Sequence, residues 1–345
     1  MSSVKRKGER VTLKEVAKHA GVSTATVSYV INNTRYVSDK LKSSVLNAVD
    51  ELGYSPNNIA RSLRSNQTYT IGLIVSNVEN PFYTEIARAI EEKAYSEGYS
   101  VIICNSEDDI LKETNYLKLL QSKRLDGIIL APAPGENEHL YYVLQENSMP
   151  IVLLNRKLDV EGIPIIKINN RHSAERCVNH LIETHGYRDI GAVIGSVETL
   201  LSKDRYDGFV HALNSFGLPV RNEWIIHGNS SFAGGYKALK HLMGKDKRPE
   251  AIFIGGSLMY LGVLSALKEL HLKCPEDIAL IGFSEMRFSH LLEPPLSTIH
   301  QPAKKLAELS LEVLLQQISG IERKQNAFEL ETELIIRNSC GCNKM

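Results

Sequence analysis

The residues most suited to a chemical task lie in one short stretch near the N-terminus, Val11 to Asn32. The second half of this stretch predicts a helix whose first turn and a half carries four outward side chains: Thr24, Ala25, Ser28 and Tyr29. Small and hydroxyl-bearing side chains at the start of such a helix can reach base edges in the major groove of DNA. The pattern makes double-stranded DNA the first partner to consider.

Two short helices joined at Gly21 must position this face. Thr12 and Glu15 form a T-x-x-E capping box that starts the first helix, and Ser23 can cap the second. A third helix, from Ser38 to Gly53, is expected to pack on both. The shared apolar core is expected to contain Leu13, Val16, Ala17, Ala20, Val27, Val30, Ile31, Leu41, Val45, Ala48, Val49 and Leu52. These signals predict a small all-helical helix-turn-helix head, although a generic three-helix bundle would share the apolar spacing.

The following segment, Tyr54 to Ser65, predicts a conditional helix. Its Ser-Pro pair suits a helix start, but about nine helical residues are too few to be stable alone in water. Arg61 and Arg64 flank Leu63, so the segment offers two phosphate partners around one apolar side chain. This combination is typical of a side chain that inserts between two base pairs in the minor groove and unstacks them, while neighbouring arginines bind the phosphates. The alternative is a linker with an isolated leucine.

The capping-box helix, the sequence GVSTATVS and the pattern Y-S-P-N-x-x-A-R-S-L together resemble the lactose-repressor (LacI/GalR) family of bacterial transcription regulators. The resemblance extends to the C-terminus. It implies a homodimeric repressor of carbohydrate-related genes whose heads read a pseudo-palindromic operator, while Leu63 of each protomer enters the minor groove. The expected DNA-binding residues are Thr12, Ser23, Thr24, Ala25, Thr26, Ser28, Tyr29, Asn32, Tyr54, Asn57, Ala60, Arg61, Leu63 and Arg64.

Tyr29 departs from the pattern of that family. Its position on the recognition helix often carries arginine or histidine, and tyrosine cannot make the bidentate guanine contact of arginine. We expect Tyr29 to contact a base, so the operator should differ at the corresponding base pair of each half-site. The alternative is that the ring lies against a phosphate and contributes position only.

Charge is divided unevenly along the chain. Residues 1–66 contain eleven Lys/Arg and five Asp/Glu, a net charge of +6, so the rest of a chain with 40 of each carries −6. A basic head supplies phosphate affinity with strong salt dependence, but no sequence selectivity. The charge pattern therefore agrees with a DNA-binding head on a separate body.

The body predicts a doubly wound α/β fold. Apolar runs recur at β-α-β spacing and are separated by amphipathic segments such as Phe82 to Glu97 and Ala174 to Thr184, which favours parallel sheets covered on both faces. The expected strands are Ile71 to Val75, Val101 to Cys104, Ile128 to Leu130, Ile151 to Leu154, Ile190 to Ile194, Ala251 to Ile254 and Ile278 to Ile281.

The resemblance to the family, and to periplasmic sugar-binding proteins, implies two such lobes with a ligand cleft between them. The chain should cross between the lobes near Asn169, His300 and Phe328. The expected domains are a head over residues 1–56, a hinge helix and linker over 57–69, an N-terminal lobe over 70–168 plus 300–327, and a C-terminal lobe over 169–299 plus 328–345.

Three places match residues that hold the effector in that family. Phe82 and Tyr83 follow Asn80-Pro81 in an N-P-F-[FY] segment, with a strand-helix junction as the alternative role. Arg205, in D-R-x-x-G-F, matches the effector-binding arginine. Arg156 ends an apolar run, where ligands of open α/β sheets collect, although it could equally form a salt bridge at the cleft edge.

Three departures remove acidic groups from the expected cleft. Gly256-Ser257 replaces the usual Asn-Asp pair, Ser284 replaces an aspartate, and Asn169 replaces another. Carboxylates typically hold sugar hydroxyls, so their loss beside Arg205 predicts an anionic effector, such as a sugar acid or sugar phosphate. The effector-binding residues expected here are Phe82, Tyr83, Arg156, Asn169, Arg205, Ser257 and Ser284. The competing hypothesis is that small-molecule sensing is lost and a regulatory protein controls the chain.

Other function classes receive little support. The sequence holds no G-x-G-x-x-G, P-loop or G-x-S-x-G motif, so an enzyme is not expected, and no catalytic residue is assigned. A solute-binding protein would explain the body but not the head. No early apolar run and no membrane-length apolar stretch appears, so we expect a cytoplasmic protein with no membrane partner.

The five cysteines predict no cofactor. Cys104, Cys177 and Cys274 lie in or beside apolar segments and are expected to be small buried residues. Cys340 and Cys342 form a C-x-C that could join a metal site. Since no second pair or histidine cluster lies nearby in the sequence, a reduced thiol pair at the surface is expected and no metal is assigned.

Overall fold

The computed structural model describes residues 11–32, 35–54, 67–135, 149–156, 162–196, 199–283, 285–321 and 325–342. The chain divides into two compact units, Met1–Thr68 and Tyr69–Met345. Within the described ranges, no helix is both long and apolar enough to cross a membrane.

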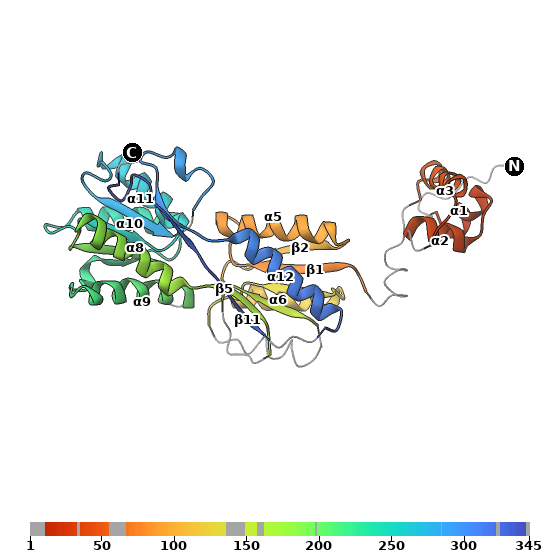
Figure 1. Ribbon diagram of the computed structural model, residues 1–345, viewed down its shortest axis with the longest axis horizontal. Helices are drawn as coiled ribbons and strands as arrows, with labels where there is room; N and C mark the ends of the chain where they lie inside the picture. The colour runs from red at the N-terminus through yellow and green to blue at the C-terminus, as the bar shows by residue number, and fades with distance from the viewer. Residues whose placement is uncertain are drawn as a thin grey trace. The chain divides into compact units, whose positions relative to one another are not determined.

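Three helices form the first unit, drawn in red in Figure 1: α1 (Leu13–Ala20), α2 (Thr24–Asn32) and α3 (Asp39–Leu52). Val16, Val27 and Val45 are fully buried where the helices meet. Leu41 was expected in this core but is exposed. The reason is that residues 39–43 are all exposed, so the first turn of α3 extends beyond the contact with the other helices.

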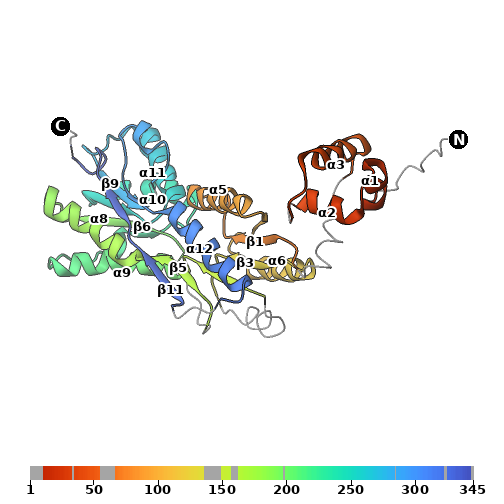
Figure 2. The same cartoon turned by 45° about the vertical axis from the view of Figure 1, so that its right-hand side comes forward.

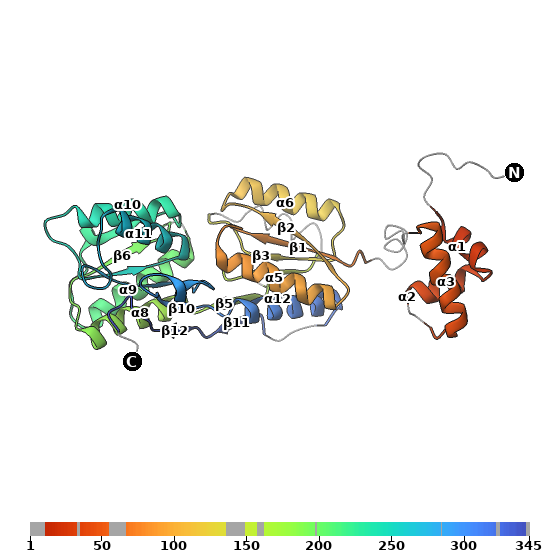
Figure 3. The same ribbon diagram turned by 90° about the horizontal axis from the view of Figure 1, so that it is seen from above.

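The first lobe of the body contains a six-stranded parallel sheet of order β11-β5-β4-β3-β1-β2. Its strands are β1 (Thr70–Val75), β2 (Ser100–Asn105), β3 (Gly127–Leu130), β4 (Ile151–Leu154), β5 (Ile165–Ile168) and β11 (Ala327–Leu330). Helices α5 (Pro81–Ser96) and α12 (Ala303–Ile318) cover one face, and α6 (Ile110–Ser122) covers the other (Figure 3). Alternate residues of β1 accordingly face different clusters, with Leu73 toward α5 and Ile74 toward α6.

The second lobe repeats this arrangement with sheet order β12-β10-β9-β8-β6-β7. Its strands are β6 (Ile190–Ile194), β7 (Ile225–His227), β8 (Ala251–Ile254), β9 (Ala279–Phe283), β10 (Ser297–His300) and β12 (Glu333–Ile335). All pairs are parallel except β12, which runs antiparallel to β10. Helices α8 (Asn170–His185) and α9 (Leu200–Ser215) cover one face, and α10 (Phe232–Met243) and α11 (Ser257–Glu269) cover the other (Figure 3).

The chain crosses between the lobes three times. The first crossing follows β5 at Ile168, and the second lies between β10 and α12. The third was expected near Phe328, with the C-terminal lobe resuming at residue 328, but Phe328 itself pairs with Ile166 inside the first sheet, where β11 runs beside β5 (Figure 2). The crossing therefore lies between Leu330 and Glu333.

The sequence pattern does not predict β5, β7, β10, β11 or β12. Each contains three or four residues and at least one polar side chain, as in IIKI, IIH, STIH, AFEL and ELI. The expected strands, by contrast, are apolar runs, and all of them except the edge strand β2 are buried on both faces, which is the usual signature of a central parallel strand.

Candidate functional site

The outward face of α2 begins with a cap that uses two of the expected DNA-binding hydroxyls. The Thr26 amide donates to Ser23 Oγ at 3.1 Å, and the two hydroxyl oxygens lie 2.9 Å apart. Thr24 and Ala25 are exposed beside them. The cap fixes the start of α2 and leaves the Thr24-Ala25 corner of the helix accessible.

The predicted capping box is present at the start of α1. The Thr12 amide donates to Glu15 Oε2 at 2.7 Å, and the Glu15 amide donates to Thr12 Oγ1 at 3.4 Å. At the other end, His19 Nε2 lies 2.6 Å from Glu51 Oε2 on α3. This contact joins α1 to α3, so His19 belongs to the scaffold of the head.

Tyr29 is half-buried, and its ring forms a cation–π contact with an arginine that the sequence pattern did not identify. The Arg35 guanidinium carbon lies 5.2 Å from the ring centre, and Arg35 itself is exposed. The sequence pattern missed Arg35 because this residue follows α2 in a loop, where helical periodicity does not predict the direction of a side chain. Tyr29 and Arg35 together present an aromatic edge and a positive charge at the end of α2.

The remaining head residues are placed only in part. Tyr54 is half-buried and packs against the head core. The side chain of Asn32, and the whole of Asn57, Ala60, Arg61, Leu63 and Arg64, lie outside the described residues.

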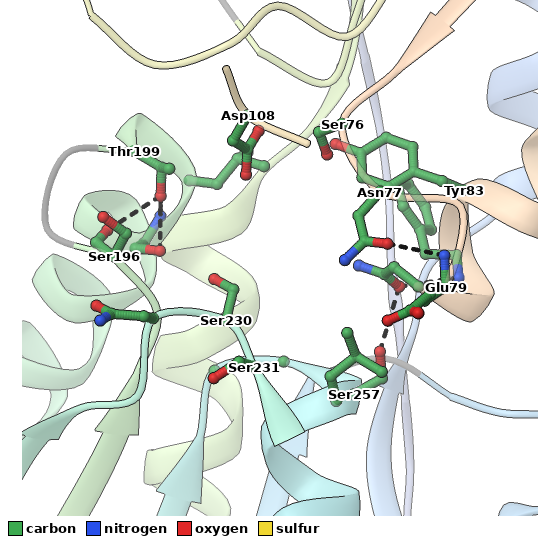
Figure 4. A pocket seen from close by; sticks show the side chains of 18 of the residues that line it. Ser76, Asn77, Glu79, Tyr83, Asp108, Ser196, Thr199, Ser230, Ser231 and Ser257 are labelled. Carbon is green, nitrogen blue, oxygen red and sulfur yellow. Dashed lines mark hydrogen bonds between the residues drawn. The ribbon is translucent and has the colours of Figure 1, made fainter. Parts of the chain in front are cut away.

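A cavity of about 400 Å³ lies between the two lobes of the body. Its walls come from the carboxyl ends of parallel strands in both sheets, which is where open α/β folds bind ligands. The lining segments begin at Ser76 after β1, Glu107 after β2, Asn155 after β4, Ser196 after β6, Asn229 after β7 and Gly255 after β8. Figure 4 shows Tyr83 and Asn77 on one wall and Ser230 and Ser257 on the opposite side.

Arg205 projects from α9 into this cavity, and the contacts that it makes with the described residues are to groups without negative charge. Its Nε donates to Asn170 Oδ1 at 2.9 Å and its Nη1 donates to the Gly255 carbonyl at 2.6 Å. The guanidinium also lies 3.9 Å from the centre of the Phe283 ring. Burial lowers the pKa of Arg205 to about 10, so the side chain remains a cation at neutral pH.

Arg156 differs because a carboxylate already neutralises it. Its Nη1 donates to Asp108 Oδ1 at 2.5 Å and to the Pro132 carbonyl at 2.8 Å. Of the two expected arginines, Arg205 is the one positioned to bind an anionic group, and Arg156 forms the salt bridge that was the alternative interpretation.

Three buried polar atoms of the cavity have no hydrogen-bond partner among the residues that the structure describes: Tyr83 Oη, Asn155 Oδ1 and Arg156 Nε. Leaving such atoms unpaired costs on the order of 1–3 kcal/mol each. A polar ligand in the cavity would supply the missing partners.

Backbone strain also concentrates here. In the described part of the chain, eight non-glycine residues have positive φ, and five of them line the cavity: Glu107, Asp108, Asn155, Asn229 and Ser230. Such residues persist where the surrounding structure holds a binding surface in place. For Glu107, Asp108 and Asn155, the position just after an expected strand is the signal that would have identified them from the sequence. Asn229 and Ser230 follow β7, which the sequence pattern did not predict.

The expected effector residues divide into three groups. Phe82, Tyr83, Arg156, Arg205 and Ser257 line the cavity. Asn169 does not, which corrects that expectation: its Oδ1 accepts the His172 amide at 3.0 Å and its Nδ2 donates to Glu329, because the residue caps α8. The neighbouring Asn170 contacts Arg205 instead. Ser284 lies outside the described residues.

The cysteines depart from expectation at the C-terminus. Cys104 and Cys177 are buried as expected, and Cys274 is half-buried. The expectation of a surface thiol pair without nearby histidine is wrong, since Cys340 is fully buried and His180 and His185 lie beside both thiols. These four side chains are the group of His, Cys, Asp and Glu residues in the described part that could hold a metal ion.

Comparison with known families divides the chain in the same way. Residues 12–57 match the bacterial regulatory proteins of the lacI family. Residues 68–338 match the periplasmic binding proteins and sugar binding domain of LacI family.

Two relatives share most of their length with this chain. The HTH-type transcriptional repressor PurR of Pasteurella multocida (strain Pm70) is 37% identical over 328 residues, 95% of this chain and 98% of the relative. The repressor PurR of Pectobacterium atrosepticum is 38% identical over 328 residues, 95% of this chain and 96% of the relative.

Solved structures of similar architecture include two regulators. The lac repressor dimer bound to operator and the anti-inducer ONPF has a TM-score of 0.84 and 26% identity, with 96% of this chain and 99% of that chain covered. The transcriptional regulator CelR–cellobiose complex has a TM-score of 0.72 and 27% identity, with 96% and 100% covered.

Proposed function

This chain belongs to the LacI family of bacterial regulatory proteins, and on that premise we propose that it is a homodimeric repressor controlled by an anionic small molecule in the interlobe cavity. The observation that carries the ligand assignment is Arg205, a buried cation in the cavity wall whose contacts with the described residues include no carboxylate.

For DNA reading, α2 enters the major groove with Thr24, Ala25, Ser28 and Tyr29 toward the bases. The hinge segment that contains Leu63 then folds in the central minor groove when two protomers bind one operator. Phosphate contacts position the head, and base contacts select the sequence.

The test is selection of bound duplexes from a random pool, followed by sequencing, with wild type and Leu63→Ala at two salt concentrations. We expect wild type to enrich a palindrome and the variant to bind it at least about tenfold more weakly. Without the leucine wedge the DNA does not bend, and the protein loses a few kcal/mol of binding free energy from the contacts that the bend permits. Absence of any enriched sequence at either salt, with and without candidate effectors, would contradict the DNA-reading proposal.

The dimer is proposed to form through the edge of the first sheet. Strand β2 lies at that edge, and its Ile102 and Ile103 are exposed. Tyr95 at the end of α5 and Leu111 on α6 are also exposed, and a group of exposed apolar side chains is typical of an interface. Sedimentation should show dissociation of Leu111→Asp but not of Leu291→Asp, an exposed leucine of the second lobe.

The effector is proposed to place an acidic group against Arg205 and hydroxyl groups toward the serine-rich wall. That wall includes Ser196, Ser230 and Ser257. Carboxylates of the first lobe, such as Glu79, offer acceptors for donors elsewhere on the ligand. A sugar acid or sugar phosphate has both kinds of group.

Titration calorimetry with gluconate, glucose 6-phosphate and neutral cellobiose tests this assignment. Wild type should bind an anionic ligand. Arg205→Gln should bind it roughly 10–100-fold more weakly, which corresponds to the loss of one hydrogen bond to a charged group. Arg221→Gln, which removes an arginine of the same lobe that lies over Trp224 outside the cavity lining, is the matched control and should leave the affinity unchanged. Tight binding of cellobiose alone would refute the anionic assignment, and binding of no ligand by a chain that reads DNA would indicate control by a protein partner.

A further inference from the structure

Two histidines and two cysteines that are far apart in the sequence meet in the second lobe. His180 and His185 lie in the last turns of α8, and Cys340 and Cys342 lie in the turn that follows β12. One nitrogen or sulfur atom from each residue lies within 4.8 Å of all the others. We infer that this His2Cys2 cluster is a structural zinc site that fastens the end of the chain to α8.

The distances within the cluster match the edges of a zinc tetrahedron. His180 Nε2 lies 3.4 Å from Cys340 Sγ and 3.6 Å from Cys342 Sγ. His185 Nε2 lies 3.2 Å from Cys342 Sγ. Zinc bonds of about 2.3 Å to sulfur and about 2.0–2.1 Å to nitrogen give N···S edges of about 3.5 Å in tetrahedral geometry. The four atoms therefore need only small shifts to surround one ion.

Outer hydrogen bonds orient two of the four ligands. Thr184 Oγ1 lies 3.2 Å from His180 Nδ1. In the tautomer that binds a metal through Nε2, Nδ1 carries the proton and donates it to this hydroxyl, and the lone pair of Nε2 faces the sulfur atoms. Ser297 Oγ donates to Cys340 Sγ at 3.1 Å, which stabilises a thiolate. Such second contacts typically accompany metal ligands and fix the histidine tautomer.

Gly341 closes the cluster between the two cysteines. Its φ of +106° is a left-handed conformation that L side chains rarely adopt, and a Cβ there would lie 3.1 Å from Tyr187 Oη and 3.2 Å from His185 Nδ1. The Tyr187 ring stacks on the His185 ring, with centroids 5.5 Å apart. Glycine therefore lets the short C-x-C loop present both thiols to an imidazole that is already held in place.

The donor set selects the ion. Two thiolates and two neutral imidazoles balance the charge of Zn²⁺, so the occupied cluster is neutral and suits a partly buried position. On binding, each thiol releases its proton to solvent, and the metal–sulfur bonds replace the contact that Cys340 Sγ makes with the Arg337 carbonyl. The spacing H-x4-H is typical of zinc sites.

The test uses the full chain, purified under reducing, anaerobic conditions without chelator. Elemental analysis should find about one zinc ion per chain, and replacement by Co²⁺ should give a thiolate charge-transfer band and the intense visible bands of a tetrahedral site. Cys342→Ser and His185→Gln should weaken metal binding at least about tenfold. Cys104→Ser, in the first lobe, and His172→Gln, an exposed histidine of α8, should bind zinc as wild type does.

Circular dichroism and thermal unfolding of each variant establish that it is folded. The inference fails if folded wild type gives no thiolate–cobalt band, or if Cys342→Ser gives the same band as wild type. It also fails if the freshly purified chain contains a Cys340–Cys342 disulfide under these conditions. None of these outcomes depends on the identity of the effector or of the operator.

Discussion

The hydroxyl of Ser257, at the start of α11 in the second lobe, donates a hydrogen bond to Asn80 Oδ1 in the first lobe at 3.2 Å. Asn80 also caps α5, where its Oδ1 accepts the Phe82 amide at 3.1 Å. The bond spans the effector cavity and links the N-termini of two helices, one in each lobe. It therefore stabilises this arrangement of the lobes by an amount typical of one hydrogen bond.

Removal of that bond should loosen the cavity without unfolding either lobe. We expect Ser257→Ala to weaken the interlobe contact by about 0.5–1.5 kcal/mol, which is roughly 2–10-fold in the opening equilibrium. Amide hydrogen exchange should accelerate by that factor in residues 80–84 and 256–260, with β3 unchanged. Ser310→Ala, which removes a hydroxyl bonded within α12, is the matched control. Equal exchange rates in Ser257→Ala and wild type would show that the bond does not hold the lobes.

Tyr29 should determine part of the operator sequence. We expect Tyr29→Ala to change the preferred base pair at one position of each half-site, because an aromatic side chain on the reading face is replaced by a methyl group. Sequencing of selected duplexes measures the change. Tyr36→Ala removes a fully exposed tyrosine of the following loop and should leave the motif intact. An unchanged motif with uniformly weaker binding for Tyr29→Ala would instead assign this residue to a phosphate contact.

The Arg337–Glu285 pair should carry a large share of the stability of the second lobe. Arg337 Nη1 and Nη2 donate to the two carboxylate oxygens at 2.9 and 2.6 Å, and both side chains are largely buried. Glu285→Ala leaves a buried cation without its partner, so we expect a loss of about 3–5 kcal/mol in the free energy of unfolding. Urea titration should show almost no loss for Glu308→Ala, which breaks the exposed Lys304–Glu308 pair. A cost below about 1 kcal/mol for Glu285→Ala would contradict this prediction.

Gly262 should be required for the packing of α10 against α11. A Cβ at this position would lie 2.0 Å from the Phe232 carbonyl oxygen, which is backbone and cannot move aside cheaply. Alanine favours a helix by about 1 kcal/mol over glycine, but the clash outweighs this gain. We expect Gly262→Ala to reduce the free energy of unfolding by about 1–3 kcal/mol. Gly244→Ala, where the nearest atom is at 3.3 Å, should be nearly neutral, and a stabilised Gly262→Ala would refute the packing argument.

Local signals predicted the head well, because its helices depend on nearby residues. The capping box of Thr12 and Glu15 joins residues three positions apart, and the turn at Gly21 needs one residue type. The strands of the body that were predicted are those with uninterrupted apolar runs. Those that were missed, such as β7 and β12, form only because a neighbouring strand is already in place.

Local sequence signals predicted only some of the residues that line the cavity. Asn169 and Asn170 differ by one position, and only the start of α8 decides that the first caps the helix and the second contacts Arg205. The His2Cys2 cluster joins residues about 160 positions apart, so no local spacing reveals it. Topology brings these residues together, and the sequence pattern had not located β12.

The third crossing between the lobes also determines when the protein can finish folding during synthesis. The second lobe receives β12, Arg337 and its two terminal cysteines only after the chain has completed α12 and β11 of the first lobe. Until then β10 presents an open strand edge, which is a site of aberrant pairing between chains. A ribosome that stops before residue 333 therefore releases a body with an exposed edge, even though most of the second lobe, residues 169–300, has already been made.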